Sequence, residues 1–148
     1  MRKKFLVSLA LVAGIGITGF ATTAFAGDIV DKGFTFYIST SGSVAHTERR
    51  AKYDATSAYM RFDWIQDGAG GYRVKVVDRD GNDFSKFWWY DNFNEYTVGK
   101  ETWLKNYAYE DRGRGVEVKI KAEGQGGAVS GGIWSTGGVW SPDSVGGN

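Results

Sequence analysis

Apolar and polar side chains alternate with a period of two along most of the chain, and this alternation limits the fold more than any other feature. The alternating segments are residues 34–38, 58–64, 72–76 and 116–122. Successive side chains of a strand point to opposite faces, so each segment predicts a strand with one face in a core and one in water. Residues 84–90 also predict a strand, but with large aromatic side chains on both faces.

Glycine-rich breaks separate these segments at residues 67–71, at Asp80-Gly81 and at residues 124–132. An Asp-Gly pair supplies the positive φ angles of a tight hairpin turn. Residues 100–109 depart from the alternation and predict a short helix or a pair of turns. The whole pattern predicts an all-β fold, an antiparallel β-sandwich or small barrel of about seven strands, with one short helix or turn near 100–110.

The first 26 residues have the three parts of a secretory signal peptide. A basic start, Met1 to Lys4, precedes an apolar stretch at 5–20 and an Ala24-Phe25-Ala26 cleavage sequence. A membrane anchor is the alternative, but the apolar stretch is shorter than the ~20 residues of a membrane span. We expect cleavage between Ala26 and Gly27, which leaves a single secreted, extracellular β domain at 27–148 with no membrane anchor.

Composition excludes several classes of site. The 148 residues include no cysteine and one histidine, so disulfides, thiolate nucleophiles, zinc-thiolate sites and iron–sulfur clusters are ruled out. The chain has 18 basic and 17 acidic residues, and loss of Arg2, Lys3 and Lys4 with the leader leaves 15 against 17, a formal charge of −2. A nearly neutral domain has no electrostatic footprint for nucleic acid, so we expect no nucleic-acid partner. Nothing in the sequence points to a cofactor.

An acidic loop is the one candidate for a metal site. Asp78, Asp80 and Asp83 lie close together around a glycine, and calcium takes several oxygen ligands from such loops. The spacing does not match an EF-hand. The favoured interpretation is a polar hairpin turn, because strands are predicted on both sides.

The sequence offers two catalytic possibilities, and neither assigns a catalytic residue. His46 could act as a general base beside Ser41, Ser43 or Glu48, but no nucleophile elbow is present and an exposed structural histidine is favoured. Paired carboxylates could serve glycoside hydrolysis. The available acids are Asp63, Asp67, Asp91, Glu95, Glu101, Glu110 and Asp111. Their abundance makes every pair uninformative, so a small hydrolase is the least favoured function.

An aromatic cluster is the most suggestive feature for binding. Five aromatic side chains lie within residues 87–93, and further tryptophans follow downstream. The possible binding surface consists of Phe87, Trp89, Trp134 and Trp140. Exposed aromatic rings stack on sugars or anchor in partner proteins. A core strand covered by the last segment is the favoured alternative, because large exposed apolar patches are uncommon on monomers.

Several short motifs resemble a group of small exported proteins of Gram-positive bacteria that have no known function and end in a Trp-Ser-Pro-Asp-Ser signature. The motifs are residues 34–38, 49–53, 57–60, 106–113 and 138–145. The resemblance implies a secreted β-rich protein with no assigned enzymatic activity, and it supplies no catalytic residues. A weaker similarity is to lactococcin-type bacteriocins, through the repeated Gly-Gly-x-Trp-Ser elements at 131–135 and 137–141.

These observations favour a non-enzymatic secreted domain that binds a cell-wall polysaccharide or an envelope protein. The alternatives are a bacteriocin-like or toxin-like protein and a carbohydrate-binding module. Two structural predictions accompany this hypothesis. Ile120 should face the core, and Trp140 should dock into the sandwich, with the turn at 141–144 ending the last strand.

Overall fold

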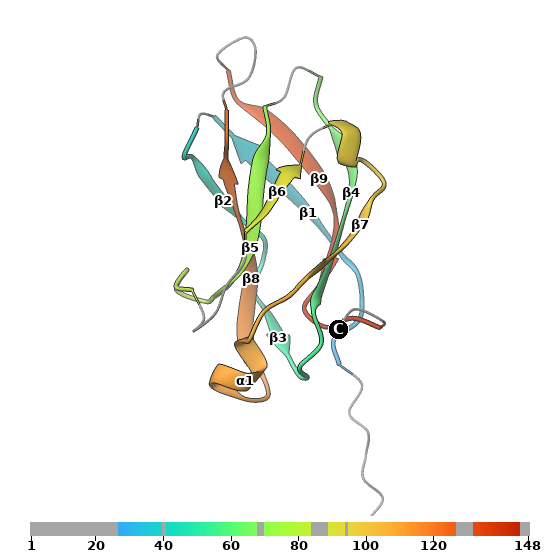
Figure 1. Ribbon diagram of the computed structural model, residues 1–148, viewed down its shortest axis with the longest axis vertical. Coiled ribbons are helices and arrows are strands. Elements are labelled where there is room, and N and C mark those ends of the chain that lie inside the picture. Colours follow the sequence, from blue (N-terminus) through green and yellow to red (C-terminus); the bar gives the residue numbers. More distant parts are fainter. Residues whose placement is uncertain are drawn as a thin grey trace, which may run out of the picture.

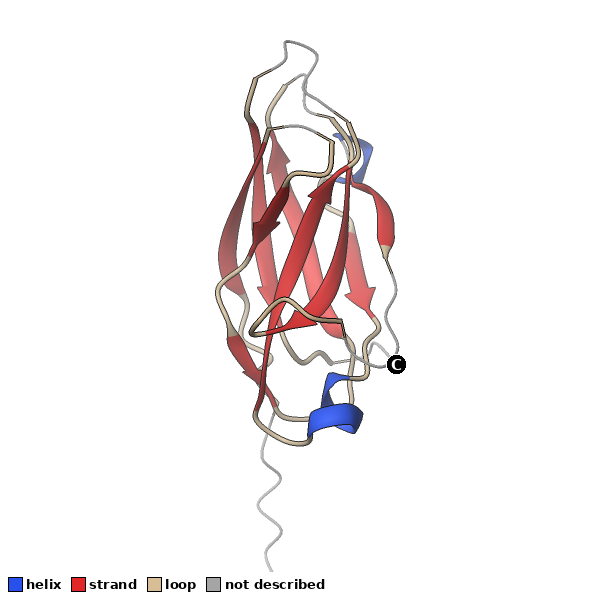
Figure 2. Cartoon of the chain, turned by 90° about the vertical axis from the view of Figure 1, so that its left-hand side faces the viewer, coloured by secondary structure: helices blue, strands red, loops and turns tan. Residues whose placement is uncertain are grey.

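Two antiparallel sheets pack face to face in the computed structural model of the chain (Figure 1). The model describes residues 27–39, 41–67, 70–83, 89–93, 95–126 and 132–145. The described strands form an elongated sandwich with short helical segments at opposite ends, and they do not close into a barrel (Figure 2). The predicted sandwich is confirmed, and its described residues form nine strands instead of about seven.

Sheet A contains four strands in the order β1-β9-β4-β7. Their bounds are Lys32–Ile38 for β1, Trp134–Ser141 for β9, Ala58–Ile65 for β4 and Glu101–Leu104 for β7. The last strand in the sequence therefore lies in the interior of the sheet, between β1 and β4.

Sheet B contains β2 (Val44–His46), β8 (Val116–Gly124), β5 (Tyr72–Asp78) and β6 (Tyr90–Phe93), in this order. The short strand β3 (Arg50–Lys52) pairs with β8 at residues 116–118, so β2 and β3 occupy successive parts of the same edge of β8.

The segment near 100–110 differs in part from its prediction. Residues 101–104 form β7 because they pair with β4, and the α-helix α1 begins later, at Ala108–Arg112. A 3-10 turn, η1 (Glu95–Thr97), precedes β7. Within the described part of the chain, no helix has the length and hydrophobicity needed to cross a membrane.

The core lies between the sheets and contains the side chains that the alternation predicts, including the correctly assigned Ile120. Trp64 is the exception. The register of β4 against β9 shifts between Phe62 and Trp64, which pair with the consecutive residues Gly138 and Gly137. A bulge of this kind turns the following side chain to the opposite face. Trp64 therefore lies outside the core, with 43% of its surface exposed.

The duplicated Gly-Gly-x-Trp-Ser element has a structural explanation. Trp134 and Trp140 stand six residues apart on one strand, so both point to the same face. That face is the core, where each keeps 1% of its surface exposed. The predicted docking of Trp140 is confirmed, and β9 ends at Ser141 immediately before the bend at 142–143.

Both ends of the described chain meet at β3, at the lower end of the sandwich in Figure 1. Arg50 holds the carboxylate of Asp28 with two of its nitrogens, at 3.0 and 2.5 Å. The same guanidinium donates to the Trp140 carbonyl at 2.8 Å. One side chain of β3 therefore ties the segment before β1 to the end of β9.

Candidate functional site

The acidic loop of the sequence forms the turn after β5. The Asp78 carboxylate accepts hydrogen bonds from the backbone N–H groups of Asp80 and Asn82, at 2.9 and 2.8 Å. Burial alone would raise the pKa of Asp78, but the hydrogen bonds from Asn82 and Asp80 lower it below its ordinary value. Asp83 forms an ion pair with Lys75. Among the described residues, no group of three or more potential ligands is arranged around a metal position.

His46 lies at the end of β2 and is exposed, opposite Lys121 of β8. Partial burial, followed by the charges of Lys119 and Lys121, lowers the pKa of His46 below 6.5. The Ser43 hydroxyl accepts from the backbone of Ser39 at 3.2 Å, and Glu48 lies exposed in the loop after β2.

The acids considered for hydrolysis are spread over the molecule. Asp63 is in β4, Asp67 follows it, Asp91 is in β6, Glu95 begins η1, Glu101 begins β7, and Glu110 and Asp111 are in α1. Asp63 forms an ion pair with Arg61 at 2.7 Å. Of these acids only Glu101 lines the groove described below, where Asp31 joins it.

Two of the four residues of the possible aromatic binding surface lie in the core. Trp134 and Trp140 are core residues and cannot contribute to a surface, because their even spacing places both on the inner face of β9. Phe87 lies outside the described residues. Trp89 is half-buried, and the cationic groups of Arg73 and Lys75 each lie 4.3 Å from its ring centre. Cations over an indole face stabilise its position on the protein.

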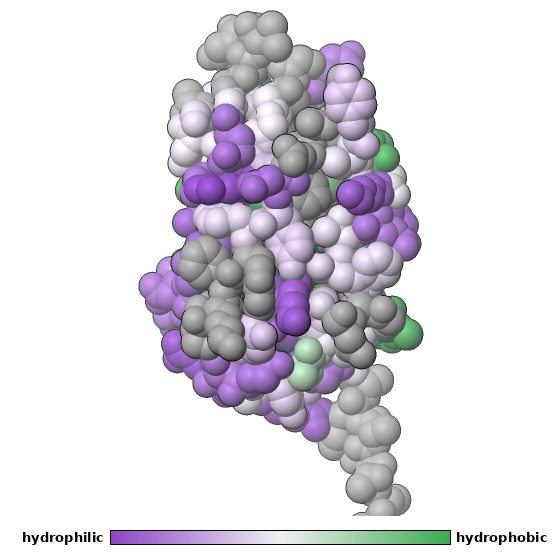
Figure 3. Space-filling model, in the orientation of Figure 1, coloured by the Kyte–Doolittle hydropathy of each residue, from purple (hydrophilic) through white to green (hydrophobic). Residues whose placement is uncertain are grey.

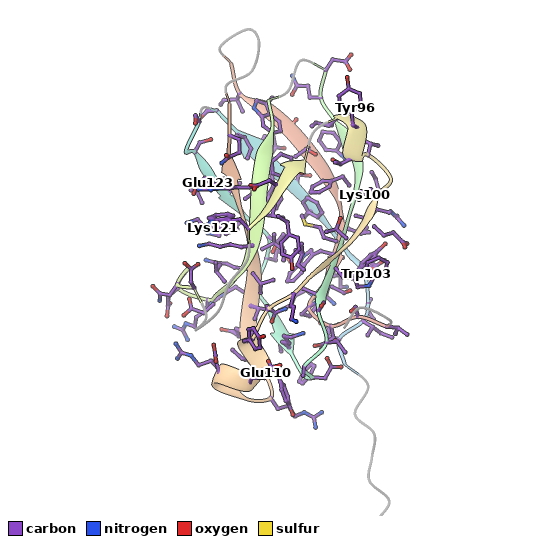
Figure 4. All side chains as sticks on the ribbon, in the orientation of Figure 1. Tyr96, Lys100, Trp103, Glu110, Lys121 and Glu123 are labelled. Atoms are coloured by element: carbon purple, nitrogen blue, oxygen red, sulfur yellow. The ribbon has the colours of Figure 1, made fainter. Side chains whose placement is uncertain are left out.

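The exposed aromatic side chains with described positions lie instead mainly on the outer face of sheet A. Tyr37 of β1, Trp64 of β4 and Trp103 of β7 all stand on this face. The Trp64 indole lies directly over Gly137, whose missing side chain would meet it at 2.8 Å. Figure 4 places Trp103 at the side of the molecule formed by β7.

The end of this face near the C-terminus is hollowed into an open groove of about 350 Å³. Its lining residues are Ile29, Asp31, Tyr59, Arg61, Glu101, Trp103, Ser141, Ser144 and Val145. The aromatic part of the wall is a cross-strand pair. Tyr59 and Trp103 stand opposite each other on β4 and β7, with their ring centres 6.1 Å apart and their planes tilted by 62°.

Hydrogen-bonding groups border this aromatic pair. The Tyr59 hydroxyl donates to Glu101 at 3.1 Å. Burial and then this hydrogen bond raise the pKa of Tyr59. Arg61 is the cross-strand neighbour of Glu101, and its guanidinium binds Asp63 through two contacts of 2.7 and 3.4 Å. The groove, which we call the Tyr59–Trp103 groove, therefore combines an apolar ring surface with donors and acceptors fixed beside it.

Hydrophilic residues dominate the face of the molecule seen in Figure 3, where hydrophobic colour appears only in small separate patches. The Tyr59–Trp103 groove was not found from the sequence. Tyr59 belongs to the polar face of a correctly predicted strand, and Trp103 falls in the segment predicted as a short helix or a pair of turns. The sequence does carry one signal, because Trp103 and Leu104 point to opposite faces, as successive residues of a strand do. That these residues form a strand depends on their pairing with β4, which is distant in the sequence.

The sequence from residue 22 to residue 144 matches the model of DUF2712, a protein family of unknown function. The match covers most of the chain. The chain belongs to the DUF2712 family. The matched region includes all of the strands described above, so the DUF2712 model covers the whole sandwich.

Comparison of this DUF2712 chain with the curated proteins and with the solved structures gave no match. The family description assigns no activity. The function of this chain must therefore be inferred from its own surface.

Proposed function

We propose that the chain is a secreted, non-enzymatic binding domain that recognises a cell-wall polysaccharide through the Tyr59–Trp103 groove. The observation that supports this proposal most is the combination of a ring pair with fixed polar groups in one open groove on the outer face of sheet A. The proposal includes the removal of residues 1–26 as a signal peptide. The resemblance to exported proteins of Gram-positive bacteria supports this part of the proposal.

The chemistry of the groove suits a sugar ring. A sugar presents C–H groups on its faces and hydroxyl groups around its edge, and aromatic side chains offer an apolar face to the former. Hydroxyl groups both donate and accept hydrogen bonds, so they need partners of both kinds. Trp103, with 40% of its surface exposed, supplies the apolar contact. Arg61 supplies donors, and Glu101 and Asp31 supply acceptors.

The binding test uses cell walls of a Gram-positive bacterium that have been boiled in detergent and treated with protease. We expect the protein, residues 27–148, to sediment with these walls, and soluble wall fragments to change its tryptophan fluorescence. Trp103→Ala should weaken binding at least about tenfold, or ~1.4 kcal/mol, as expected for a central aromatic contact. Tyr96→Ala, at a highly exposed position of η1, is the control and should bind normally.

Other results would change the proposed function. Retention only on walls that still carry protein would favour an envelope protein as the partner. Release of reducing sugar ends would favour a hydrolase that uses Glu101 and Asp31. Inhibition of sensitive bacteria without wall binding would favour the bacteriocin-like alternative. Equal binding by the Trp103→Ala and Tyr96→Ala variants would exclude this groove as the binding site.

A further inference from the structure

A buried Lys52–Asp143 pair joins β3 to the segment after β9, at the end of the sandwich where both chain ends meet. Both side chains are fully buried, and Lys52 Nζ lies 3.0 Å from Asp143 Oδ1. The two residues are 91 positions apart in the sequence. The groove proposed for binding uses neither side chain, so this pair is independent of that function.

The surroundings of Lys52 orient its nitrogen toward Asp143. Nζ donates to the carbonyl of Pro142 at 2.7 Å and to the carbonyl of Thr56 at close range. A tetrahedral ammonium has three N–H directions. Two are fixed by these carbonyls, and the third points to the Asp143 carboxyl group. When that third proton leaves, the nitrogen lone pair points to Asp143.

The surroundings of Asp143 activate its carboxyl group for attack. The backbone N–H groups of Asp28 and Tyr53 donate to Oδ2 at 2.7 and 3.0 Å. Two backbone donors on one oxygen stabilise the negative charge that develops there when a nucleophile adds to the carbon. The other oxygen, Oδ1, accepts from Lys52 Nζ at 3.0 Å and, at longer distances of 3.3 and 3.4 Å, from the backbone N–H groups of Tyr53 and Asp54. The shorter backbone contacts on Oδ2 favour the oxyanion there and leave Oδ1, which faces Lys52, as the leaving oxygen.

A second carboxylate, Asp54, stands beside the pair. A side chain at Gly27 would meet Asp54 Oδ2 at 2.6 Å and Asp143 Oδ2 at 2.9 Å, so both carboxyl groups face the same point. Burial would raise the pKa of Asp54, but the hydrogen bonds from Thr56 and the contact with Asp143 lower it. Asp54 is therefore ionised at neutral pH, and its contact with Asp143 gives a proton that leaves Lys52 a path to that carboxyl group.

From this geometry we infer that Lys52 and Asp143 form an intramolecular isopeptide bond, an amide between Lys52 Nζ and Asp143 Cγ. Enclosure favours the step, because a buried ion pair carries a large desolvation cost and an amide carries no charge. Holding the two groups in contact also replaces an encounter between separate molecules.

The reaction balances without any other reagent. The Lys52 ammonium gives one proton to Asp143 Oδ1, and the lone pair left on the nitrogen adds to Asp143 Cγ. The oxyanion forms on Oδ2. The nitrogen then loses a second proton through Asp54, the bond from Cγ to Oδ1 breaks, and Oδ1 leaves with two protons as water. One N–H remains on the nitrogen and can still donate to a neighbouring carbonyl.

Mass spectrometry of the folded protein after trypsin digestion tests the inference. Trypsin does not cleave after an acylated lysine, so the expected product is a branched peptide of residues 51–61 and 122–148. Its mass should be lower than the sum of the two peptides by one water molecule. Cleavage after Lys52 and a linear peptide 122–148 in the folded wild-type protein would overturn the inference. The readout does not depend on where the N-terminus is processed or on binding to walls.

Two variants separate the chemistry from the fold. Lys52→Arg keeps a cation beside Asp143 but removes the nucleophile, so it should give linear peptides only. Asp54→Asn should fold with the same circular dichroism spectrum and form the branched peptide many times more slowly. A branched peptide at the wild-type rate in Asp54→Asn would remove Asp54 from the mechanism, and one in Lys52→Arg would show that Lys52 is not the residue joined.

Discussion

At the scale of single residues, the close approach of neighbouring strands in sheet A limits which side chains are tolerated. Gly138 of β9 shows this most clearly, because a Cβ there would lie 2.0 Å from the carbonyl oxygen of Arg61. That contact is between adjacent strands of sheet A and cannot be relieved by rotating a side chain. Glycine is required at this position because the Arg61 carbonyl leaves no room for a Cβ atom, although other residues could adopt the backbone conformation of Gly138.

Gly138→Ala should destabilise the protein by at least ~1–3 kcal/mol, the range for overpacking a well-packed interior. Guanidinium denaturation followed by tryptophan fluorescence measures the loss. Gly71→Ala is the matched control, because a Cβ at Gly71 meets nothing within 4 Å. Equal unfolding midpoints for the two variants would mean that β4 and β9 are farther apart than the structure shows.

Ile120→Ala should lower the free energy of unfolding by ~2–5 kcal/mol, because Ile120 is fully buried on β8. Glu117→Ala, on the exposed face of the same strand, should change it by less than ~0.5 kcal/mol. Urea denaturation of both variants makes the comparison. A loss below ~1 kcal/mol for Ile120→Ala would contradict the assignment of the core face.

At the scale of elements, the short strand β3 and the segment after β9 stabilise each other. Arg50 and Lys52, on the same face of β3, hold the ends of the described chain through Asp28 and Asp143. Asp143 also accepts from the backbone of Tyr53 at 3.0 Å. The residues after β9 are therefore part of the folded unit.

Deleting residues 142–148 should lower the melting temperature by at least ~10 °C. The deletion leaves Lys52 buried without Asp143, to which it is joined in the intact protein. A buried charge that has lost its partner costs ~3–5 kcal/mol, with several degrees lost per kcal/mol. Differential scanning calorimetry gives the value. Deleting only 146–148, which retains Asp143, is the control. If both deletions melt together, the segment after β9 does not stabilise the sandwich.

The elements were predictable where local pattern determines them. Alternation correctly gave the core faces of β4, β5 and β8, and the position of Trp140 followed from the cost of exposing an indole. The bulge before Trp64, the strand β7 and the pairing of Lys52 with Asp143 were missed. Each of these features depends on which distant segment lies beside it, and the local sequence does not determine that. The Tyr59–Trp103 groove was missed for the same reason, because its walls come from four separate segments.

At the scale of the whole molecule, ionised carboxylates in hydrogen-bonded positions link stability to pH. The pKa values of Asp54 and Asp78 are lowered in the folded state from the ordinary value of 3.8. A group with a lower pKa in the folded state stabilises it above the unfolded value, and this contribution is lost as the pH falls through the folded value. Both carboxylates therefore favour the folded state at neutral pH.

The urea midpoint should consequently be constant near neutral pH and fall as the pH drops below 3.8. Asp78→Asn should be less stable than wild type at neutral pH and lose less on acidification. Asp67→Asn, in the exposed turn after β4, is the control and should follow the wild-type curve. Parallel curves for wild type and Asp78→Asn would show that the turn carboxylate contributes nothing to the acid response.

The order of strands in sheet A has a consequence for the time course of folding. β9 lies between β1 and β4, yet it is made after all the others. Until it arrives, β1 and β4 each carry an edge of unpaired N–H and C=O groups, and open edges recruit other strands. Pairings between distant parts of a chain also form slowly. A nascent chain of this protein therefore passes through a stage in which the position between β1 and β4 is vacant. Its own β9 and a strand of a neighbouring molecule then compete for that position.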